Sequence, residues 1–169
     1  ISIEEFAPFL EDLEKDLVSK GFAILERRHS NERYALLKVK DRVTNTTVDM
    51  TVHTMLPIYN TKLIRLYSLY DQRFHILGIY FKHWVKLNKI GGAPENYLSS
   101  YALLILVIHF LQSEIHPCVL PILQKIQNVE KIYKYSHSGN NFAVNVYFED
   151  NNEKIEEYMN IVNGNEANK

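Results

Sequence analysis

Three lysines in the middle of the chain, Lys82, Lys86 and Lys89, are spaced so that a helix would carry them along one line. Side chains at positions i, i+4 and i+7 lie above one another on an α-helix. A row of ammonium groups can hold a polyanion such as a triphosphate. An ordinary solvent-exposed helix face would show the same spacing, so the lysines alone leave both interpretations open.

Asp49 is the second residue that could do chemistry. It lies in the alternating segment 47–53, which predicts a strand with Val48 and Met50 on one face and Asp49 on the other. An acid in a half-buried strand is disfavoured unless its face is solvated or holds a metal ion. Metal-assisted phosphoryl transfer needs several carboxylates, so Asp49 alone also fits the wet side of an edge strand.

The elements that must position these residues change in type along the chain. Hydrophobic periodicity and turn signals predict strands early and helices later. We expect helices from Ile3 to near Gly21, over 60–70 and 71–90, and from Ser99 or Ser100 to about Ser113, with one or two helical turns within 155–162. Asp71 is expected to cap its helix, and the helix that ends at about Ser113, apolar nearly all round, is expected to be buried among other helices. We expect strands over 22–26, 34–39, 47–53 and 142–148, and a turn at Asn140–Asn141. This order predicts an α+β protein, with a sheet layer joined to a helical domain near residue 55.

Charge is unevenly distributed, although the net charge is only −1. Segment 3–17 holds six acids and one lysine, segment 60–89 holds six bases and one acid, and segment 149–169 holds six acids and two lysines. A basic middle between acidic ends suggests a site for a polyanion. A solvated helix face is again the alternative.

Composition excludes several classes of protein. With 46% hydrophobic residues and 11 Gly plus Pro residues in 169, the chain is neither disordered nor collagen-like. The single cysteine, Cys118, excludes an intramolecular disulfide framework and a cysteine-based zinc finger. The longest apolar run, 101–111, is too short to span a bilayer, and no secretory signal is visible. We therefore expect an intracellular protein without a membrane partner.

Three segments together resemble a known family. They read VDMTVHTMLPIYNT (48–61), LYSLYDQRFHILGIYFKHWVK (66–86) and LSSYALLILVIHFLQ (98–112). In this order and spacing they resemble the central block of the RNA terminal uridylyltransferases and noncanonical poly(A) polymerases, members of the polymerase-β-type nucleotidyltransferase superfamily. The resemblance covers residues 1 to about 125 well and continues more weakly beyond.

The resemblance implies a role for each matching residue. Asp49 matches the last of three catalytic carboxylates, which completes the metal site and activates the RNA 3′ hydroxyl. Asn60 and Thr61 match a pair that holds the ribose, although a helix N-cap would explain them equally well. Lys82 and Lys86 match two lysines that grip the triphosphate.

Two further positions follow from the same resemblance. Ser100 matches a phosphate-binding hydroxyl at a helix N-terminus, and Tyr101 matches an aromatic ring that stacks on the base. Helix N-termini commonly bind phosphate groups, and nucleic-acid bases commonly stack on aromatic rings, so both roles are physically reasonable. From the residues alone, Ser100 would be a helix cap and Tyr101 a core aromatic.

The chain also departs from the family pattern. The family's first two carboxylates form an Asp-x-Asp element after a Gly-Ser pair, and neither occurs here. We therefore expect a portion of a larger enzyme, with residues 1–55 forming the C-terminal part of the catalytic domain. Residues 56–169 are expected to form the helical poly(A)-polymerase-associated domain, incomplete at its C-terminal end.

The implied function is template-independent addition of UMP, less favourably AMP, from an NTP to an RNA 3′ end with release of pyrophosphate. The implied cofactor is Mg²⁺ or Mn²⁺. The expected partners are the NTP, with UTP favoured, the RNA 3′ end, and the remainder of the enzyme or a complementary chain. The cytoplasm is favoured as the compartment over a mitochondrion. The alternative is a catalytically inactive nucleotidyltransferase-fold module that binds RNA or a protein partner.

Overall fold

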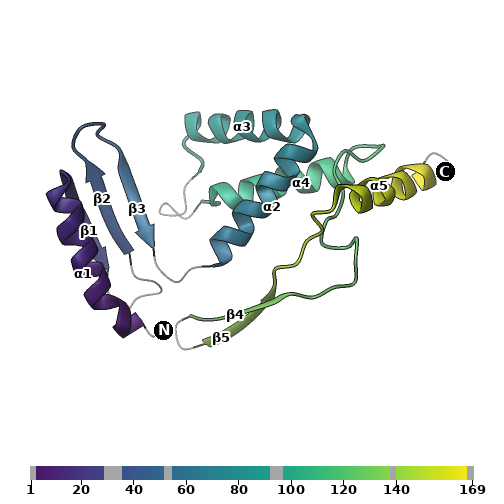
Figure 1. Ribbon diagram of the computed structural model, residues 1–169. Coiled ribbons are helices and arrows are strands. Elements are labelled where there is room, and N and C mark those ends of the chain that lie inside the picture. The colour runs from purple at the N-terminus through teal and green to yellow at the C-terminus, as the bar shows by residue number, and fades with distance from the viewer. Residues whose placement is uncertain (1–2, 29–35, 52–54, 92–96, 138–139, 167–169) are drawn as a thin grey trace. The chain divides into compact units, whose positions relative to one another are not determined.

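The computed structural model describes residues 3–28, 36–51, 55–91, 97–137 and 140–166 (Figure 1). The chain divides into two compact units. The first comprises Ile1–Met55 with Lys134–Ala143, and the second comprises Leu56–Tyr133 with Val144–Lys169. The presence of both helices and sheets confirms the predicted α+β class. The assignment of residues 1–55 to a catalytic domain and of 56–169 to a helical domain stays a prediction.

The first unit contains a helix and a three-stranded antiparallel sheet. The helix α1 (Ile3–Ser19) is followed by β1 (Phe22–Arg28), β2 (Leu36–Asp41) and β3 (Thr47–Thr51), and the strand order is β1-β2-β3. In Figure 1, α1 lies along the sheet beside β1. Leu36, Leu37 and Val39 of the central strand β2 are buried.

Local chemistry sets the connection from α1 to β1. The helix is followed by Gly21, whose φ of +93° lies in the left-handed region that costs other residues steric strain. An ion pair between Arg27 of β1 and Glu14 then joins the strand back to the helix. The predicted helix and strands of this unit agree with the observed ones within a few residues, except that residues 34–35 and 52–53 lie outside the described ones.

The second unit is built from four helices. They are α2 (Leu56–Tyr70), α3 (Gln72–Leu87), α4 (Ser100–Ser113) and α5 (Asn152–Glu166). Its core gathers apolar side chains from all four helices and from the segment between α4 and β4: Leu63, Tyr67, Phe74, Val107, Ile108, Leu111, Val119, Leu120, Leu123 and Ile155. No helix in the described part of the chain is long and apolar enough to cross a membrane.

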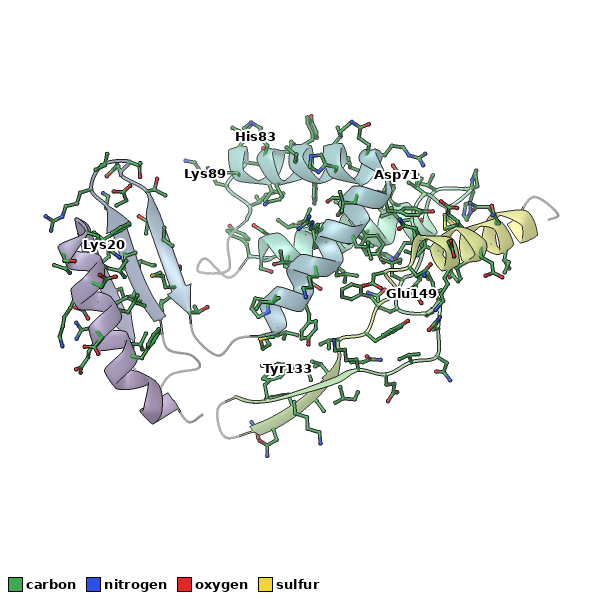
Figure 2. The ribbon with its side chains drawn as sticks, in the orientation of Figure 1. Lys20, Asp71, His83, Lys89, Tyr133 and Glu149 are labelled. Atoms are coloured by element: carbon green, nitrogen blue, oxygen red, sulfur yellow. The ribbon has the colours of Figure 1, made fainter. Side chains whose placement is uncertain are left out.

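Two helices of this unit begin at side-chain caps. Asp71 caps α3 by accepting a hydrogen bond from the backbone N–H of Arg73 at 2.7 Å, and Ser99 caps α4 by accepting from the N–H of Ala102 at 3.2 Å. Figure 2 labels Asp71 at the start of α3. Caps of this kind satisfy backbone donors that have no partner inside the helix. Of the two serines considered for α4, Ser99 is therefore the cap and Ser100 is the first helical residue.

Two expectations for the helices are wrong. The helix expected at 60–70 begins at Leu56, because Pro57 fits the first turn, where its missing N–H costs nothing. The helix α4 is not buried all round, since Leu106 and Phe110 expose 50% and 44% of their surface. Its other face, which includes Leu103 and Val107, supplies the buried contacts.

A two-stranded sheet and α5 complete the chain. The strands are β4 (Ile132–His137), which the sequence analysis missed, and β5 (Asn140–Asn145), which includes the asparagines expected in a turn. Buried Glu149 then precedes α5 and accepts hydrogen bonds from the Tyr147 hydroxyl and the Asn151 N–H, at 3.1 and 3.0 Å. Burial by itself would raise the pKa of Glu149, but these hydrogen bonds lower it.

Candidate functional site

A cleft of about 540 Å³ opens in the second unit between the end of α3 and the start of α4. Lys82, Lys86 and Lys89 line one side of it, and Ser100 lines the other. The remaining lining residues are Val85, Gly91, Tyr97 and Leu103. The structure thus brings together three of the residues implied by the resemblance, Lys82, Lys86 and Ser100.

The lysines of this cleft are available to a ligand. All three are exposed, and none forms an ion pair with another described residue. Lys82 and Lys86 lie one helical turn apart on α3, whereas Lys89 follows the helix with a φ of 55°. Figure 2 labels Lys89 just beyond the end of α3. Three unpaired cations around one hollow favour an anion of high charge.

The opposite wall of the cleft adds a helix N-terminus. Ser100 is the first residue of α4 and is exposed, so its hydroxyl is free to donate to a ligand. The first N–H groups of a helix and its dipole also favour a negative group at this position. The lysines and the N-terminus of α4 therefore both contribute positive electrostatic potential to this cleft.

Tyr101 does not line the cleft, although it follows Ser100 directly. Its side chain is half-buried, and burial raises the pKa of its hydroxyl. Tyr97, which does line the cleft and is 49% exposed, is an aromatic ring that the sequence analysis did not single out. The sequence feature that could have indicated Tyr97 is its position shortly before Ser99, the cap of α4.

Asn60 and Thr61 also lie outside the cleft lining. Because α2 begins at Leu56, these residues occupy its second turn and are not N-caps. The Thr61 hydroxyl donates to the backbone carbonyl of Pro57 at 2.8 Å, a common bond for a threonine inside a helix. Helix capping therefore does not account for this pair.

Asp49 lies in the first unit, on β3. Its carboxylate is 56% exposed and stands 3.8 Å from the Lys38 ammonium, which is itself 3.5 Å from Glu26. These residues pair across β1, β2 and β3, so they form a row of acid, base and acid on one face of the sheet. Val48, which the alternation puts on the other face of β3, is also exposed at 41%, so exposure does not separate the two faces of this strand.

The described residues contain no group of three or more His, Cys, Asp or Glu side chains that could hold a metal ion. A two-ion site for phosphoryl transfer needs several carboxylates. Asp49 suits one ligand position by its exposure, but its charged neighbour is Lys38, a cation. The described residues therefore do not by themselves fit such a site.

Comparisons with known proteins give a consistent picture, although no family model matches the chain. Human poly(A) RNA polymerase GLD2 is 36% identical over 91 residues, which cover 54% of this chain and 19% of GLD2. Human terminal uridylyltransferase 7 is 35% identical over 111 residues, which cover 66% of this chain and 7% of that protein. The chain thus spans no more than about 19% of the length of these relatives.

Solved structures of the same kind share the fold. The Cid1 poly(U) polymerase with Mg 3′-dATP bound has a TM-score of 0.68 at 21% identity, over 92% of this chain and 48% of Cid1. The mtPAP structure in complex with ATPγS has a TM-score of 0.71 at 18% identity, over 98% of this chain and 36% of mtPAP. The chain is thus similar in sequence to part of a poly(A) RNA polymerase and part of a terminal uridylyltransferase, and it shares part of the fold of Cid1 and mtPAP.

Proposed function

We propose that this chain is the nucleotide-holding part of an RNA 3′-terminal nucleotidyltransferase. The observation that carries the proposal is the cleft in which Lys82, Lys86 and Lys89 face Ser100 at the start of α4. Relatives named as poly(A) RNA polymerase and terminal uridylyltransferase support the same class of reaction. In that reaction the RNA 3′ oxygen bonds to the α-phosphorus of the NTP, and the bond to the β-phosphoryl group breaks, with release of pyrophosphate and a proton.

The cleft is assigned to the triphosphate. Lys82 and Lys86 supply two point charges one turn apart, Lys89 supplies a third, and Ser100 with the α4 N-terminus supplies hydrogen-bond donors. Three ammonium groups offset most of the negative charge of a triphosphate. Holding it in this way orients the α-phosphoryl group, which is the main task of a protein in phosphoryl transfer.

The remaining residues are assigned from the resemblance. Tyr101 is proposed to stack on the base, and Asn60 and Thr61 are proposed to hold the ribose. Asp49 is proposed to help activate the RNA 3′ hydroxyl and to contribute one ligand to Mg²⁺ or Mn²⁺. Because the described residues offer no group of three metal ligands, the other carboxylates of that site must come from outside them.

The nucleotide is proposed to be UTP in preference to ATP, and the compartment to be the cytoplasm in preference to a mitochondrion. The relatives include proteins named for both poly(A) and uridylyl transfer, and mtPAP is among the structural neighbours. Titration of the chain with each of the four NTPs separately tests the choice of base. An equal affinity for all four would contradict the preference for UTP.

The triphosphate assignment is tested by NTP titration of Lys82→Ala and Lys86→Ala. Each change removes a charge-assisted contact of about 1.5–3 kcal/mol, so the dissociation constant should rise about 10- to 150-fold. Lys125→Ala is the matched control, because Lys125 is also exposed but lies outside the cleft. Wild-type affinity in both cleft variants would show that the lysines are only a solvent-exposed helix face.

The role of Asp49 is tested by RNA tailing. The 169-residue chain alone should add no nucleotide at any Mg²⁺ concentration, because its described residues offer no group of three metal ligands. When a protein segment that supplies the further carboxylates restores tailing, Asp49→Asn should abolish it and leave NTP affinity unchanged. Mg²⁺-dependent tailing by the chain alone would overturn this assignment.

A further inference from the structure

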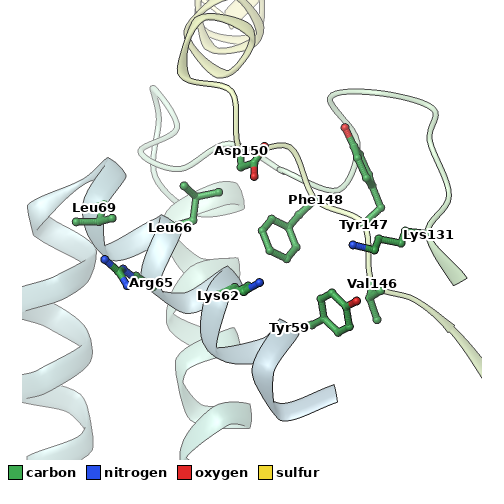
Figure 3. A pocket seen from close by; sticks show the side chains of 10 residues that line it. All are labelled: Tyr59, Lys62, Arg65, Leu66, Leu69, Lys131, Val146, Tyr147, Phe148 and Asp150. Carbon is green, nitrogen blue, oxygen red and sulfur yellow. The ribbon is translucent and has the colours of Figure 1, made fainter. Parts of the chain in front are cut away.

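A second hollow of about 540 Å³ lies in the second unit, on α2 and beside the segment that leads into α5 (Figure 3). Its lining combines cations, aromatic rings and aliphatic side chains: Tyr59, Lys62, Arg65, Leu66, Leu69, Lys131, Val146, Tyr147, Phe148 and Asp150. We refer to these ten residues as the α2 groove. It shares no lining residue with the three-lysine cleft, so a ligand could occupy each hollow separately.

The α2 groove is positively charged. Lys62 and Arg65 lie three residues apart on α2, and Lys131 faces them from the segment before β4. None of the three forms an ion pair with another described residue. Among the described lining residues Asp150 is the one acid, so three cations outweigh one carboxylate there. Unpaired cations held around a hollow favour an anionic ligand.

Aromatic rings line the same hollow. In Figure 3, the side chains of Tyr59, Phe148 and Lys62 point toward the same space. The Lys131 ammonium lies 5.0 Å from the centre of the Tyr59 ring, a cation–π distance that keeps this cation beside the ring. Such a mixture differs from the cleft lined by Lys82, Lys86 and Lys89, the three-lysine cleft, where Tyr97 is the one aromatic residue among the described lining residues.

The orientation of a second ring is fixed by hydrogen bonds. The Tyr147 hydroxyl lies 3.1 Å from the carboxylate of buried Glu149 and 3.3 Å from the Gln127 side-chain oxygen. Tyr147 lines the groove, although in Figure 3 its ring extends away from the space that Tyr59, Phe148 and Lys62 share.

We propose that the α2 groove binds a single-stranded segment of the RNA substrate, with Lys62, Arg65 and Lys131 on its phosphates and the aromatic rings on its bases. A groove that combines cations with aromatic rings offers partners to both the phosphates and the unpaired bases of a single strand, and stacking on aromatic side chains is how sequence-tolerant single-strand binding is achieved. A duplex keeps its bases paired and stacked internally, so it cannot use the rings. The inference rests on the proposed function, because that function makes RNA the acceptor.

The test measures binding of a fluorescein-labelled single-stranded RNA of about 15 nucleotides to the 169-residue chain by anisotropy, over a series of salt concentrations. In the double variant Lys62→Ala/Arg65→Ala, loss of two phosphate contacts should reduce the slope of log affinity against log salt by about 1.4. The affinity near about 0.1 M salt should fall on the order of tenfold. Lys125→Ala, which removes an exposed lysine outside the groove, should bind RNA like the wild type.

The rings are tested through Tyr59. Stacking is worth about 1–3 kcal/mol per base, so Tyr59→Ala should weaken RNA binding about 5- to 150-fold, whereas Tyr59→Phe should retain it. Thermal unfolding of each variant checks the fold, and Lys62 and Arg65 are exposed side chains whose removal leaves the core intact. If Tyr59→Ala unfolds, the Lys62/Arg65 variant still decides the proposal.

Three results would overturn the proposal: wild-type affinity and salt slope in the double variant, equal affinity for duplex RNA, or displacement of the RNA by polyglutamate as effective as by unlabelled RNA. The last result would identify an acidic peptide as the ligand. The NTP titration distinguishes this proposal from the proposed function. Lys62→Ala/Arg65→Ala should leave the NTP dissociation constant unchanged. RNA binding thus tests the role of the α2 groove, whereas NTP binding by the Lys82 and Lys86 variants tests the triphosphate assignment.

Discussion

Replacing Tyr67 with phenylalanine tests how the helices that carry both hollows are held together. The ring of Tyr67 is 1% exposed, and its hydroxyl donates to the Pro121 carbonyl at 3.1 Å. The same oxygen accepts from the Gln112 side-chain amide at 3.0 Å and from the Leu123 N–H at 3.4 Å. One hydroxyl thus links α2, α4 and the segment that follows α4.

The loss of unfolding free energy in Tyr67→Phe depends on which hydrogen-bond partners of the hydroxyl are left unsatisfied. Phenylalanine keeps the buried ring, and the Pro121 carbonyl retains a hydrogen bond from Gln112 at 2.6 Å. The Leu123 N–H, however, loses the Tyr67 oxygen in a buried position. An unsatisfied buried donor costs about 1–3 kcal/mol, so the free energy of unfolding should fall by that amount at neutral pH.

The pH dependence gives a second, independent signature. Burial, only partly offset by hydrogen bonds from the Leu123 N–H and the Gln112 side chain, raises the pKa of Tyr67 from 10 to about 12. A group whose pKa is raised in the folded state contributes stability that is complete below pH 10 and is lost as the pH rises toward 12. The loss amounts to roughly 2–3 kcal/mol in all, and roughly half of it by pH 11.

The assay is urea unfolding followed by circular dichroism, at pH 7 and at about pH 11. Tyr67→Phe should be less stable than the wild type at pH 7, and the difference should shrink by about 1 kcal/mol or more at the higher pH. Tyr80→Phe is the matched control, since Tyr80 is 67% exposed and its loss should change neither value. Equal stability of wild type and Tyr67→Phe at pH 7, or a difference that does not change with pH, would refute this reasoning.

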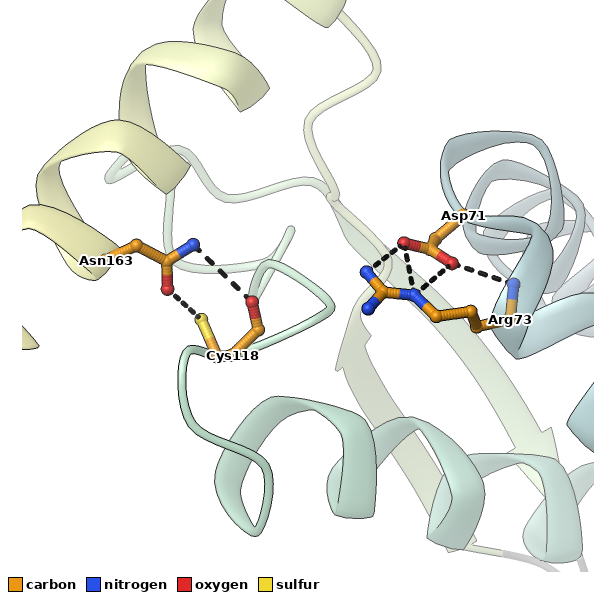
Figure 4. A network of polar contacts seen from close by, with 4 residues as sticks. All are labelled: Asp71, Arg73, Cys118 and Asn163. Atoms are coloured by element: carbon orange, nitrogen blue, oxygen red, sulfur yellow. Dashed lines mark hydrogen bonds and ion pairs between the residues drawn. The ribbon is translucent and has the colours of Figure 1, made fainter.

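Three further predictions concern the α3 cap, the proposed stacking by Tyr101 and the nucleotide cleft. Asp71→Ala should cost about 1 kcal/mol in urea unfolding at pH 7 through loss of the cap (Figure 4). The Arg73 hydrogen bond lowers the pKa of Asp71, so the difference in unfolding free energy between wild type and Asp71→Ala should be complete above pH 3.8. This difference should vanish as the pH falls through the lowered pKa, and a difference that persists at about pH 2 would contradict the prediction. Tyr101→Ala should raise the NTP dissociation constant about 5- to 150-fold and Tyr101→Phe much less, whereas equal losses would assign the effect to the hydroxyl. In Gly91→Ala the new Cβ would overlap Val85 Cγ1, so unfolding free energy should fall by about 1–3 kcal/mol and NTP binding should weaken; wild-type values would refute this steric argument.

The sequence predicted well those features that depend on neighbours along the chain. The cap at Asp71, the helix from Ser99 or Ser100 to Ser113, and the strand that carries Asp49 all follow from local spacing and side-chain chemistry. The one-turn spacing of Lys82 and Lys86 on α3 is of the same kind. A helix repeats every 3.6 residues and a strand every two, so a short stretch of sequence already determines which side chains share a face.

Elements stabilised by distant contacts were predicted less well. The helix α5 runs over 15 residues where one or two turns were expected, because buried Ile155 and Met159 hold it. Its later turns dock through Asn163, which accepts a hydrogen bond from the Cys118 thiol at 3.3 Å and donates to the Cys118 carbonyl at 3.5 Å (Figure 4). Helices in proteins gain most of their stability from such packing, which local periodicity does not encode.

The sequence by itself determined the chemical character of the candidate nucleotide site: lysines in a row, a serine at a helix start, and motifs that resemble one family. Only the tertiary structure decided which residues meet. It placed Lys89 and Tyr97 in the same cleft as Ser100 and left Tyr101 outside the lining. It also brought Lys62 of α2 to Phe148 in a groove that no sequence motif indicated. The reason is physical: hollows form where helices and loops far apart in the sequence pack together, and that packing depends on the whole core rather than on any one segment.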